Sequence, residues 1–226
     1  MRGKIRDRNG VTSFRFRIVS LGAKLAELLA FPSVCRRCGV LLEGPGERIL
    51  CPACLRRPPL LSAHRSAARY DGAVKDVLLL FKYRGLRPLG RPLASFLRAA
   101  IGDEDAPWSG ADLLIPVPLH RRRRRERGFN QAEVLADELS RLTAMPVLSG
   151  VLRKTLNLRP QTSLRSDARR ANVRGAYRVV RPESIRGKTV VLVDDVYTTG
   201  STLGECARAL KNAGAADVRG VTIARA

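Results

Sequence analysis

The chain has 226 residues, 45% of them hydrophobic, and its 42 Lys and Arg against 20 Asp and Glu give a formal net charge of +22. This length suits one α/β domain with a small additional module, and the lack of any long apolar run excludes a predicted transmembrane helix. The excess of positive charge predicts a polyanionic partner: nucleic acid, an anionic membrane surface or a phosphate-rich substrate. Codon bias in a GC-rich genome would produce the same arginine content.

The first stretch of the chain combines basic residues with an apolar segment over residues 18–31. Lys24 and Glu27 interrupt the apolar part and no small-residue cleavage site is evident, so we expect no export signal and a cytoplasmic protein. Helical spacing of leucines predicts an amphipathic helix that packs on the domain: Leu21, Leu25, Leu28 and Leu29. A peripheral position at the inner membrane is the alternative interpretation.

Four cysteines follow in two pairs, with the spacing Cys35-x2-Cys38-x12-Cys51-x2-Cys54. Two C-x-x-C pairs with a short spacer resemble a zinc ribbon, because each pair presents two thiolates to one ion and four soft ligands form a closed structural site. Disulfides are the alternative, but they need an oxidising compartment, and a redox pair would not need a duplicate. We therefore expect structural zinc in a module that spans residues 1–60.

Residues 61–108 are predicted to form a helical connecting segment, with helices over residues 70–82 and 92–100. His64 has no partner in the sequence and is predicted to lie on the surface. Three residues at the end of the first helix either line the mouth of an active site or form a solvated basic turn: Lys82, Tyr83 and Arg84.

Residues 109–226 alternate strand and helix patterns, which is typical of a parallel α/β domain. Further strands are predicted over residues 112–118, 147–153, 176–180 and 217–224, the last as an edge strand, and a helix over residues 130–142. The run 121–127 contains six arginines and one glutamate, and Lys154 begins a long basic segment. The candidates for binding pyrophosphate or nucleic acid are Arg121, Arg125, Arg127 and Lys154. A solvated basic helix start is the alternative for the arginine run.

The stretch 189–202 reads TVVLVDDVYTTGST and organises the domain. Residues 190–193 predict a short buried strand, Asp194 and Asp195 follow it, and a helical pattern begins after the loop, with Cys206 on its apolar face. Free N–H groups at a helix N-terminus attract phosphate, and hydroxyl groups donate further hydrogen bonds. The two carboxylates suit the hydroxyls of a ribose, or Mg²⁺ held by ribose and pyrophosphate oxygens. The Walker A pattern is absent, so the predicted ligand is a ribose with a 5′-phosphate.

This stretch resembles the 5-phosphoribosyl-1-diphosphate (PRPP) motif of type I phosphoribosyltransferases, and from about residue 25 onward the chain resembles the ComF competence-protein family. The pieces that match are the four cysteines, residues 81–85, 115–118, 127–131 and 193–202, and the single positions Thr155, Gln161, Arg169, Asn172 and Ala176. The resemblance implies a type I phosphoribosyltransferase fold, a parallel sheet flanked by helices, with a small N-terminal zinc-ribbon-like module. It also implies a link to natural transformation, with single-stranded DNA or DNA-uptake proteins as partners.

Carried over by residue, the resemblance puts Asp194 and Asp195 on the ribose hydroxyls or Mg²⁺. It puts the 5′-phosphate on Thr198, Thr199, Gly200, Ser201 and Thr202. In this fold the loop after the first core strand faces the pyrophosphate, and a mobile basic loop, here within residues 154–174, closes over the sugar. Purine-salvage relatives carry an aspartate base where Thr198 stands, so the resemblance leaves the catalytic residues unassigned.

Two functions follow from these observations. The first is an Mg²⁺-dependent phosphoribosyltransferase of unknown acceptor, in which catalysis is chiefly positioning and charge stabilisation. The second is a catalytically silent, zinc-containing adaptor that binds single-stranded DNA, which the net charge and the arginine run favour. The sequence favours an enzyme without deciding between them, and places the phosphoribosyltransferase domain at residues 109–226.

Overall fold

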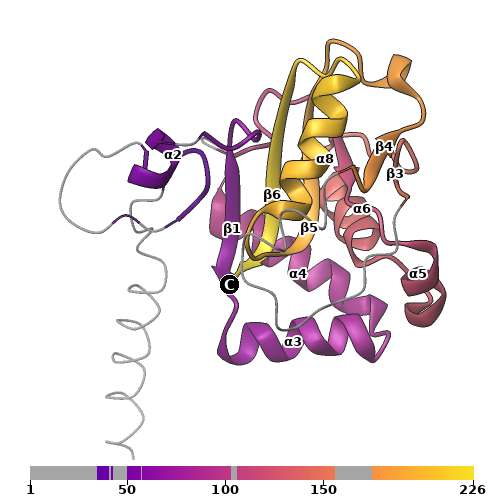
Figure 1. Cartoon of the computed structure of the whole chain (residues 1–226). Coiled ribbons are helices and arrows are strands. Elements are labelled where there is room, and N and C mark those ends of the chain that lie inside the picture. Colours follow the sequence, from indigo (N-terminus) through magenta and orange to yellow (C-terminus); the bar gives the residue numbers. More distant parts are fainter. Residues whose placement is uncertain (1–34, 41, 43–49, 57, 103–105, 156–174) are drawn as a thin grey trace, which may run out of the picture.

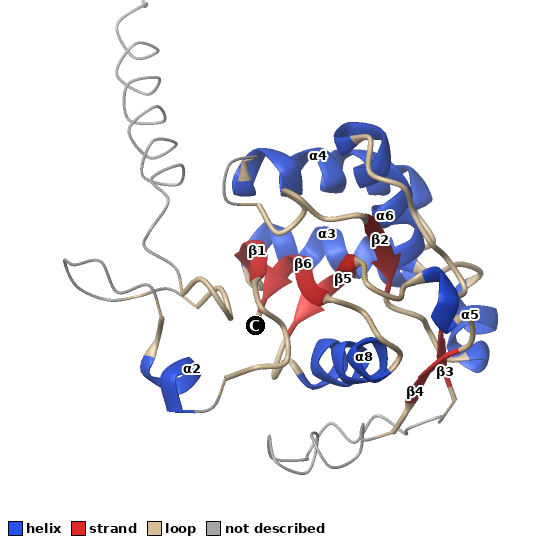
Figure 2. Ribbon diagram, turned by 90° about the horizontal axis from the view of Figure 1, so that it is seen from above, coloured by secondary structure: helices blue, strands red, loops and turns tan. Residues whose placement is uncertain are grey.

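The computed structural model describes residues 35–40, 42, 50–56, 58–102, 106–155 and 175–226. A parallel sheet lies at the centre, with helices on both of its faces (Figures 1 and 2). The predicted N-terminal helix and most of the predicted basic loop, residues 156–174, lie outside the described residues. None of the described helices has the length and apolar composition that a membrane crossing requires.

The sheet has four parallel strands in the order β1-β6-β5-β2. Their bounds are β1 His64–Arg69, β6 Asp217–Arg225, β5 Thr189–Tyr197 and β2 Leu113–Pro116. Strand β5 pairs with both neighbours, from Thr189↔Asp217 onward with β6 and from Leu113↔Val190 onward with β2. The strand that carries the acidic pair is therefore held on both sides, which fixes the position of its carboxyl end.

Strand β1 corrects two expectations from the sequence. It lies in the segment that was predicted to be helical, and it pairs with β6 from His64↔Gly220 to Arg69↔Arg225. Strand β6 is therefore an inner strand of the sheet, and the prediction that it lies at the edge is wrong. The sequence of β1, HRSAAR, lacks the β-branched and aromatic residues that usually mark a strand, so tertiary pairing rather than propensity makes it one.

The two faces of the sheet are covered by different helices. On one face pack α3 (Gly72–Tyr83), α4 (Gly90–Ile101) and α6 (Gln131–Thr143), and on the other packs α8 (Ser201–Asn212). Side chains of β5 alternate between these faces: Val190 and Leu192 lie in the cluster of α8, Val191 and Val193 in that of the other three helices. This alternation explains the uninterrupted apolar run in the sequence.

The remaining elements lie around this sheet. Their bounds are α2 Pro52–Arg56, the 3₁₀ turns η1 Arg87–Leu89 and η2 Pro182–Ser184, α5 Arg121–Arg127, β3 Leu152–Lys154 and β4 Tyr177–Val179. The strand predicted over residues 147–153 is divided: Val147 forms a parallel bridge with Leu114 beside β2, and β3 pairs antiparallel with β4. The ribbon of β3 and β4 lies beside α8, so it brings Lys154 toward the carboxyl end of β5.

Candidate functional site

The acidic pair lies at the carboxyl end of β5, where ligands bind in open α/β sheets. Strand β5 continues to Tyr197, four residues beyond the predicted end, so both carboxylates belong to the strand itself. Asp194 is paired with Thr222 of β6, and Asp194 Oδ1 accepts a hydrogen bond from the N–H of Asp195 at 2.9 Å. The strand thus fixes the backbone beneath both carboxylates.

The predicted phosphate loop connects β5 to α8. Gly200 has a φ of 73° and precedes the first helical residue, Ser201, so this position favours glycine. A Cβ at Gly200 would also collide with the ring and hydroxyl of Tyr197. The Oγ atoms of Thr199 and Ser201 lie 2.7 Å apart, at the helix N-terminus where N–H groups attract an anion.

Lys82, at the end of α3, lies against the acidic pair. Its Nζ is 3.0 Å from Asp195 Oδ2, and both side chains are mostly buried, at 14% and 13% exposure. The sequence left two interpretations of residues 82–84 open. For Lys82 the structure supports the first, in which the side chain lines the mouth of a site, because it is mostly buried against Asp195. Gln131 Nε2 donates to Lys82 O at 3.4 Å, which connects this helix end to the start of α6.

Lys154, at the end of β3, adds a second cation whose charge acts on Asp194. Burial lowers the pKa of Lys154, and the charge of Arg123 lowers it further, whereas Asp194 is close enough to raise it. Burial also raises the pKa of Asp194 to about 7, with a further increase from Asp195 and a partial compensation by Lys82 and Lys154. Two carboxylates and two ammonium groups therefore form one coupled cluster at the end of β5.

Helix α5 carries the arginine run and presents it in two directions. Residues 123 and 127 are four apart and share one helix face, where both side chains are partly buried; residues 121 and 125 share a face about 200° away and are exposed. The charge of Arg123 acts on Lys154, and Arg127 lies over the Tyr83 ring, 5.0 Å from its centroid. Among the described residues Arg121 and Arg125 have no ion-pair partner.

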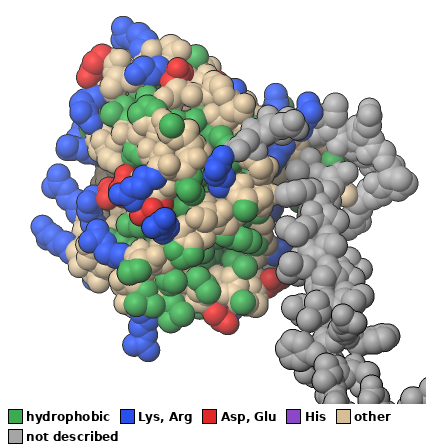
Figure 3. Space-filling model, turned by 180° about the vertical axis from the view of Figure 1, so that it is seen from behind, with side chains coloured by type: hydrophobic (Ala, Val, Ile, Leu, Met, Phe, Trp, Pro, Cys, Tyr) green, Lys and Arg blue, Asp and Glu red, His purple; other side chains and the backbone are tan. Residues whose placement is uncertain are grey.

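The predicted candidates therefore divide between two places. The acidic pair, the loop from Thr198 to Thr202 and Lys154 are brought together at the carboxyl end of β5, whereas Arg121 and Arg125 point to solvent. Figure 3 shows Lys and Arg side chains along the side of the molecule where α5 lies, and hydrophobic side chains on the lower part, where α3 lies in Figure 1. Sequence reasoning missed Arg123, although its spacing of four from Arg127 would have separated it from Arg121 and Arg125.

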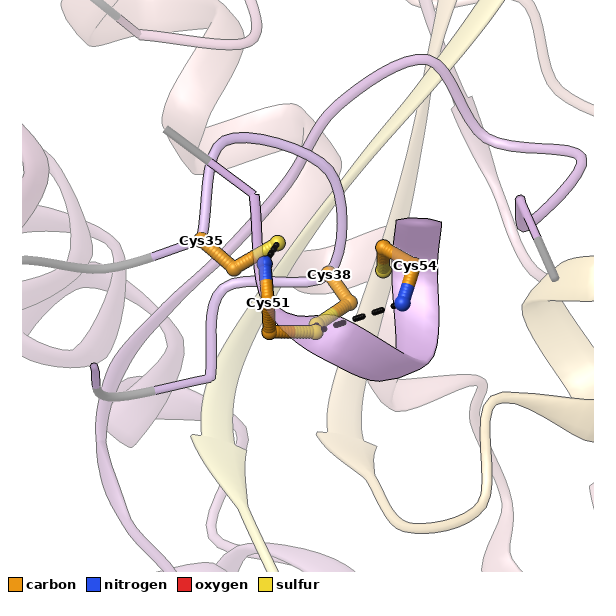
Figure 4. A group of neighbouring side chains, drawn as sticks. All are labelled: Cys35, Cys38, Cys51 and Cys54. Atoms are coloured by element: carbon orange, nitrogen blue, oxygen red, sulfur yellow. Dashed lines mark hydrogen bonds between the residues drawn. The ribbon is translucent and has the colours of Figure 1, made fainter. Parts of the chain in front are cut away.

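The four predicted metal ligands converge in the N-terminal module. Their side chains point toward one another from the loop around Cys35 and from α2 (Figure 4), and the four Sγ atoms all lie within 4.8 Å of one another. All five cysteines of the chain are free thiols, and Cys206 is fully buried on the inner face of α8, as predicted. The cluster could therefore hold one metal ion.

The spacing of the sulfur atoms tests whether zinc fits. Cys38 Sγ lies 3.7 Å from Cys51 Sγ, and a tetrahedral ion with Zn–S bonds of about 2.3 Å requires sulfurs roughly 3.7–3.8 Å apart. The N–H groups of Cys51 and Cys54 donate to Cys35 Sγ at 3.3 Å and Cys51 Sγ at 3.4 Å. Burial opposes ionisation of Cys35, but backbone N–H groups outweigh it and lower the pKa of this thiol to about 6. The donor set fits a structural zinc ion.

His64 corrects another expectation, because it is buried at 1% exposure rather than on the surface. Its Nδ1 lies 3.1 Å from the carbonyl oxygen of Cys38, and its Nε2 lies 3.2 Å from Thr222 Oγ1. A carbonyl only accepts, so Nδ1 carries the hydrogen. Burial, with the charges of Arg225 and Arg65, lowers the pKa of His64 to about 3, so the ring is neutral. The cysteine loop thus rests on β1.

Comparison with known proteins places this arrangement in a family. Residues 126–226 match the family model described as the phosphoribosyl transferase domain. Competence protein F of Haemophilus influenzae is 30% identical over 203 residues, which cover 88% of this chain and 87% of that protein. The DNA utilization protein YhgH of Escherichia coli K12 is 30% identical, over 83% of this chain and 82% of that protein. Competence protein ComFC of Bacillus subtilis is 32% identical, over 76% of this chain and 68% of that protein.

Solved structures show a weaker likeness. The glutamine PRPP amidotransferase of Bacillus subtilis, solved with ADP and GMP, is 24% identical with a TM-score of 0.37; the match covers 62% of this chain and 26% of that one. The fold assignment rests instead on the family model and on the parallel sheet with helices on both faces, which together give the predicted type I phosphoribosyltransferase fold. With relatives at 30% identity over most of both proteins, the chain belongs to the ComF (competence protein F) family.

Proposed function

We propose that the carboxyl end of β5 binds PRPP together with Mg²⁺. The observation that carries this proposal is the position of Asp194 and Asp195 directly before a hydroxyl-rich loop with positive φ at Gly200 and the N-terminus of α8. The 5′-phosphate is expected on residues 198–202, where N–H and hydroxyl donors gather. The carboxylates are expected to accept hydrogen bonds from the ribose hydroxyls.

The cations around Asp194 and Asp195 suit the pyrophosphate group of PRPP. Lys82 and Lys154 approach the carboxylates from α3 and β3, and Arg123 is near enough to lower the pKa of Lys154. Bound Mg²⁺ would supply positive charge for the departing pyrophosphate, with Asp194 and Asp195 as the residues to hold it. The protein's own part is to position the sugar and stabilise leaving-group charge. No residue is assigned as a general base, and the acceptor remains to be identified by a screen for pyrophosphate release.

The cysteine cluster is proposed to hold zinc in a structural role. Four thiol ligands leave no open coordination position, which is the arrangement of structural rather than catalytic zinc sites. The same module lies against β1 through His64, so its metal would stabilise the edge of the sheet.

A second candidate function is binding of single-stranded DNA, with or without turnover of PRPP. The observation that favours it is the exposed face of α5, where Arg121 and Arg125 point to solvent without ion-pair partners among the described residues. Phosphate contacts from such arginines carry affinity without sequence preference. The relatives named for competence and DNA utilization support a role of this kind in DNA uptake.

The experiment that tests the first proposal is calorimetric titration of the zinc-loaded protein with PRPP in the presence of Mg²⁺. We expect specific binding by the wild type and a loss of at least about tenfold in the Asp194→Asn, Asp195→Asn double variant. Its matched control changes two exposed aspartates, Asp76→Asn with Asp137→Asn, and thus has the same net charge. A wild type that does not bind, or equal loss in the control, would overturn the proposal.

A further inference from the structure

The first cysteine pair is attached to the sheet by hydrogen bonds to its backbone carbonyls. Arg65 Nη1 donates to the carbonyl oxygens of Cys35 at 3.2 Å and Arg36 at 2.9 Å. The carbonyl of Cys38 accepts from His64 Nδ1 and also from Arg225 Nη1. Because these partners belong to β1 and β6, the geometry of the cysteine loop is fixed relative to the sheet.

Gly39 shows how closely the loop approaches β1. It has a φ of 70°, and a Cβ at this position would lie 2.7 Å from the carbonyl oxygen of His64, which is closer than real Cβ contacts allow. Only glycine meets both conditions without strain. The cysteine loop therefore packs directly on the backbone of His64, in addition to the hydrogen bonds from its ring.

The ring of His64 also contacts Tyr197, which packs against the phosphate loop. The ring of His64 stacks on Tyr197, with centroids 4.2 Å apart and planes at 30°, and the guanidinium of Arg225 lies 4.8 Å from the Tyr197 centroid. Tyr197 in turn rests with its hydroxyl end on Gly200. A continuous series of contacts thus leads from Cys38 through His64 and Tyr197 to the loop that starts α8.

From this series we propose that His64 and Tyr197 are positioning residues, through which the cysteine loop holds the phosphate loop in its binding conformation. The inference rests on the proposed PRPP site, to which it adds a dependence on the metal-binding module. A loop that is already fixed before binding loses less conformational entropy when the phosphate binds, so affinity rises. Loss of the zinc ion would loosen Cys38 and, through His64, the support under Tyr197 and Gly200.

The test compares variants that break this series at different contacts. Tyr197→Leu removes the ring beneath Gly200, whereas Tyr197→Phe keeps it. His64→Phe keeps a ring to stack on Tyr197 but loses the hydrogen bonds to Cys38 and Thr222. Ser62→Ala is the control, because it removes a hydrogen bond to Asp217 at the first residue of β6, whereas Tyr197 is paired with Arg225 at the other end of that strand. Each full-length protein is titrated with Mg²⁺–PRPP and with inorganic phosphate, before and after removal of zinc by a zinc-selective chelator, and its melting temperature is recorded.

We expect Tyr197→Leu to bind both PRPP and inorganic phosphate about tenfold more weakly, with Tyr197→Phe and Ser62→Ala within about twofold of the wild type. Removal of zinc should weaken binding by the wild type about tenfold. It should weaken binding by His64→Phe clearly less, because one of the two links from the Cys38 carbonyl to Tyr197 is absent and only the one through Arg225 remains. A merely structural role would change melting temperature and leave this difference at zero.

Two results would overturn the inference: Tyr197→Leu binding as tightly as the wild type, or the same loss on zinc removal in the wild type and in His64→Phe. Both presuppose that the zinc-loaded wild type binds Mg²⁺–PRPP. If it does not bind, the proposed function itself fails and the inference with it. The two failures are therefore distinguished by the wild-type titration alone.

Discussion

At the scale of single residues, the candidate site is defined by charges that compensate one another before any ligand binds. Lys82 Nζ lies 3.0 Å from Asp195 Oδ2, and the charge of Lys154 lowers the pKa of Asp194. Such a cluster keeps the carboxylates fixed and places cations beside the proposed sugar site, where a pyrophosphate would leave if PRPP binds there. Lys82 lies outside the matched domain, residues 126–226, so the first half of the chain contributes to the site.

The first residue-scale prediction concerns Lys82. Lys82→Gln should weaken binding of Mg²⁺–PRPP about tenfold, because it removes a fixed cation next to an anionic ligand. Calorimetric titration measures the change. Lys75→Gln on the same helix removes the same charge at an exposed position and should bind like the wild type. Equal affinities of the Lys82 and Lys75 variants would contradict a role of Lys82 in the site.

The second residue-scale prediction concerns the pH dependence of stability. Burial and Asp195 raise the pKa of Asp194 from 3.8 to about 7. The folded state then binds more protons than the unfolded state, so the free energy of unfolding falls as the pH rises from about 4 to about 7. Asp194→Asn cannot ionise and escapes this loss. We expect the free energy of unfolding of Asp194→Asn, relative to that of the wild type, to rise over this pH interval and to stay level above it. The gain should be smaller than the pKa shift alone would give, because the Asp194 side chain keeps some contact with solvent.

Urea unfolding of the ligand-free protein at a series of pH values measures this difference. Asp76→Asn, at an exposed position on α3, provides the control. A stability difference between Asp194→Asn and the wild type that does not change between pH 4 and pH 8 would show that Asp194 ionises normally in the folded protein.

At the scale of elements, helix α5 separates the two candidate functions. Arg123 faces the site, whereas Arg121 and Arg125 face solvent. Arg123→Gln should therefore weaken Mg²⁺–PRPP binding and have little effect on DNA. The double variant Arg121→Gln, Arg125→Gln should do the reverse. For single-stranded DNA it should reduce the slope of log K against log salt by about 1.4, or about 0.7 for each lost phosphate contact.

Fluorescence anisotropy of a labelled oligonucleotide at several salt concentrations gives these slopes, and calorimetry gives the PRPP affinities. Both variants are judged against the wild type in each assay. An unchanged DNA affinity and salt slope in the double variant would remove the exposed face of α5 from the proposed DNA surface.

Elements also show how far the sequence could be interpreted. Strand β5, its loop and α8 were predicted because apolar run, acidic pair and helical spacing are adjacent in the chain. Helices α3, α4 and α6 were predicted within about two residues, from their apolar periodicity. Strand β1 was missed because its polar sequence becomes a strand only by pairing with β6, about 150 residues later. The prediction that β6 lies at the edge of the sheet was wrong for the same reason.

The candidate site followed the same rule. Residues within one continuous motif, from Asp194 to Thr202, were predicted together. From distant elements Lys154 was named as a candidate and Lys82 under one of two interpretations, but the contacts that join these elements were not predicted. The pairing of Lys82 with Asp195 joins α3 to β5, and the contacts of His64 join the cysteine loop to Tyr197. No local pattern encodes such contacts, since they depend on how separate elements pack. The spacing of four in α5 is an exception, because it was available in the sequence.

At the scale of the whole molecule, three parts of the chain converge on the carboxyl end of the sheet. The cysteine module contacts Tyr197, the last residue of β5, through His64; α3 contributes Lys82; and the matched domain supplies the acidic pair and the loop. On the face that Figure 3 shows, Lys and Arg side chains lie along the side where α5 lies. An anionic sugar phosphate and a nucleic-acid strand would therefore approach the same region of the protein.

The most direct test of this account is a crystal structure of the zinc-loaded protein with Mg²⁺ and PRPP. The account predicts the 5′-phosphate within hydrogen-bond distance of the loop from Thr198 to Thr202, at the N-terminus of α8. It predicts the ribose hydroxyls on Asp194 and Asp195, and the pyrophosphate toward Lys82, Lys154 and Arg123. PRPP bound elsewhere, for example on the exposed arginines of α5 with the acidic pair still closed by Lys82, would contradict it.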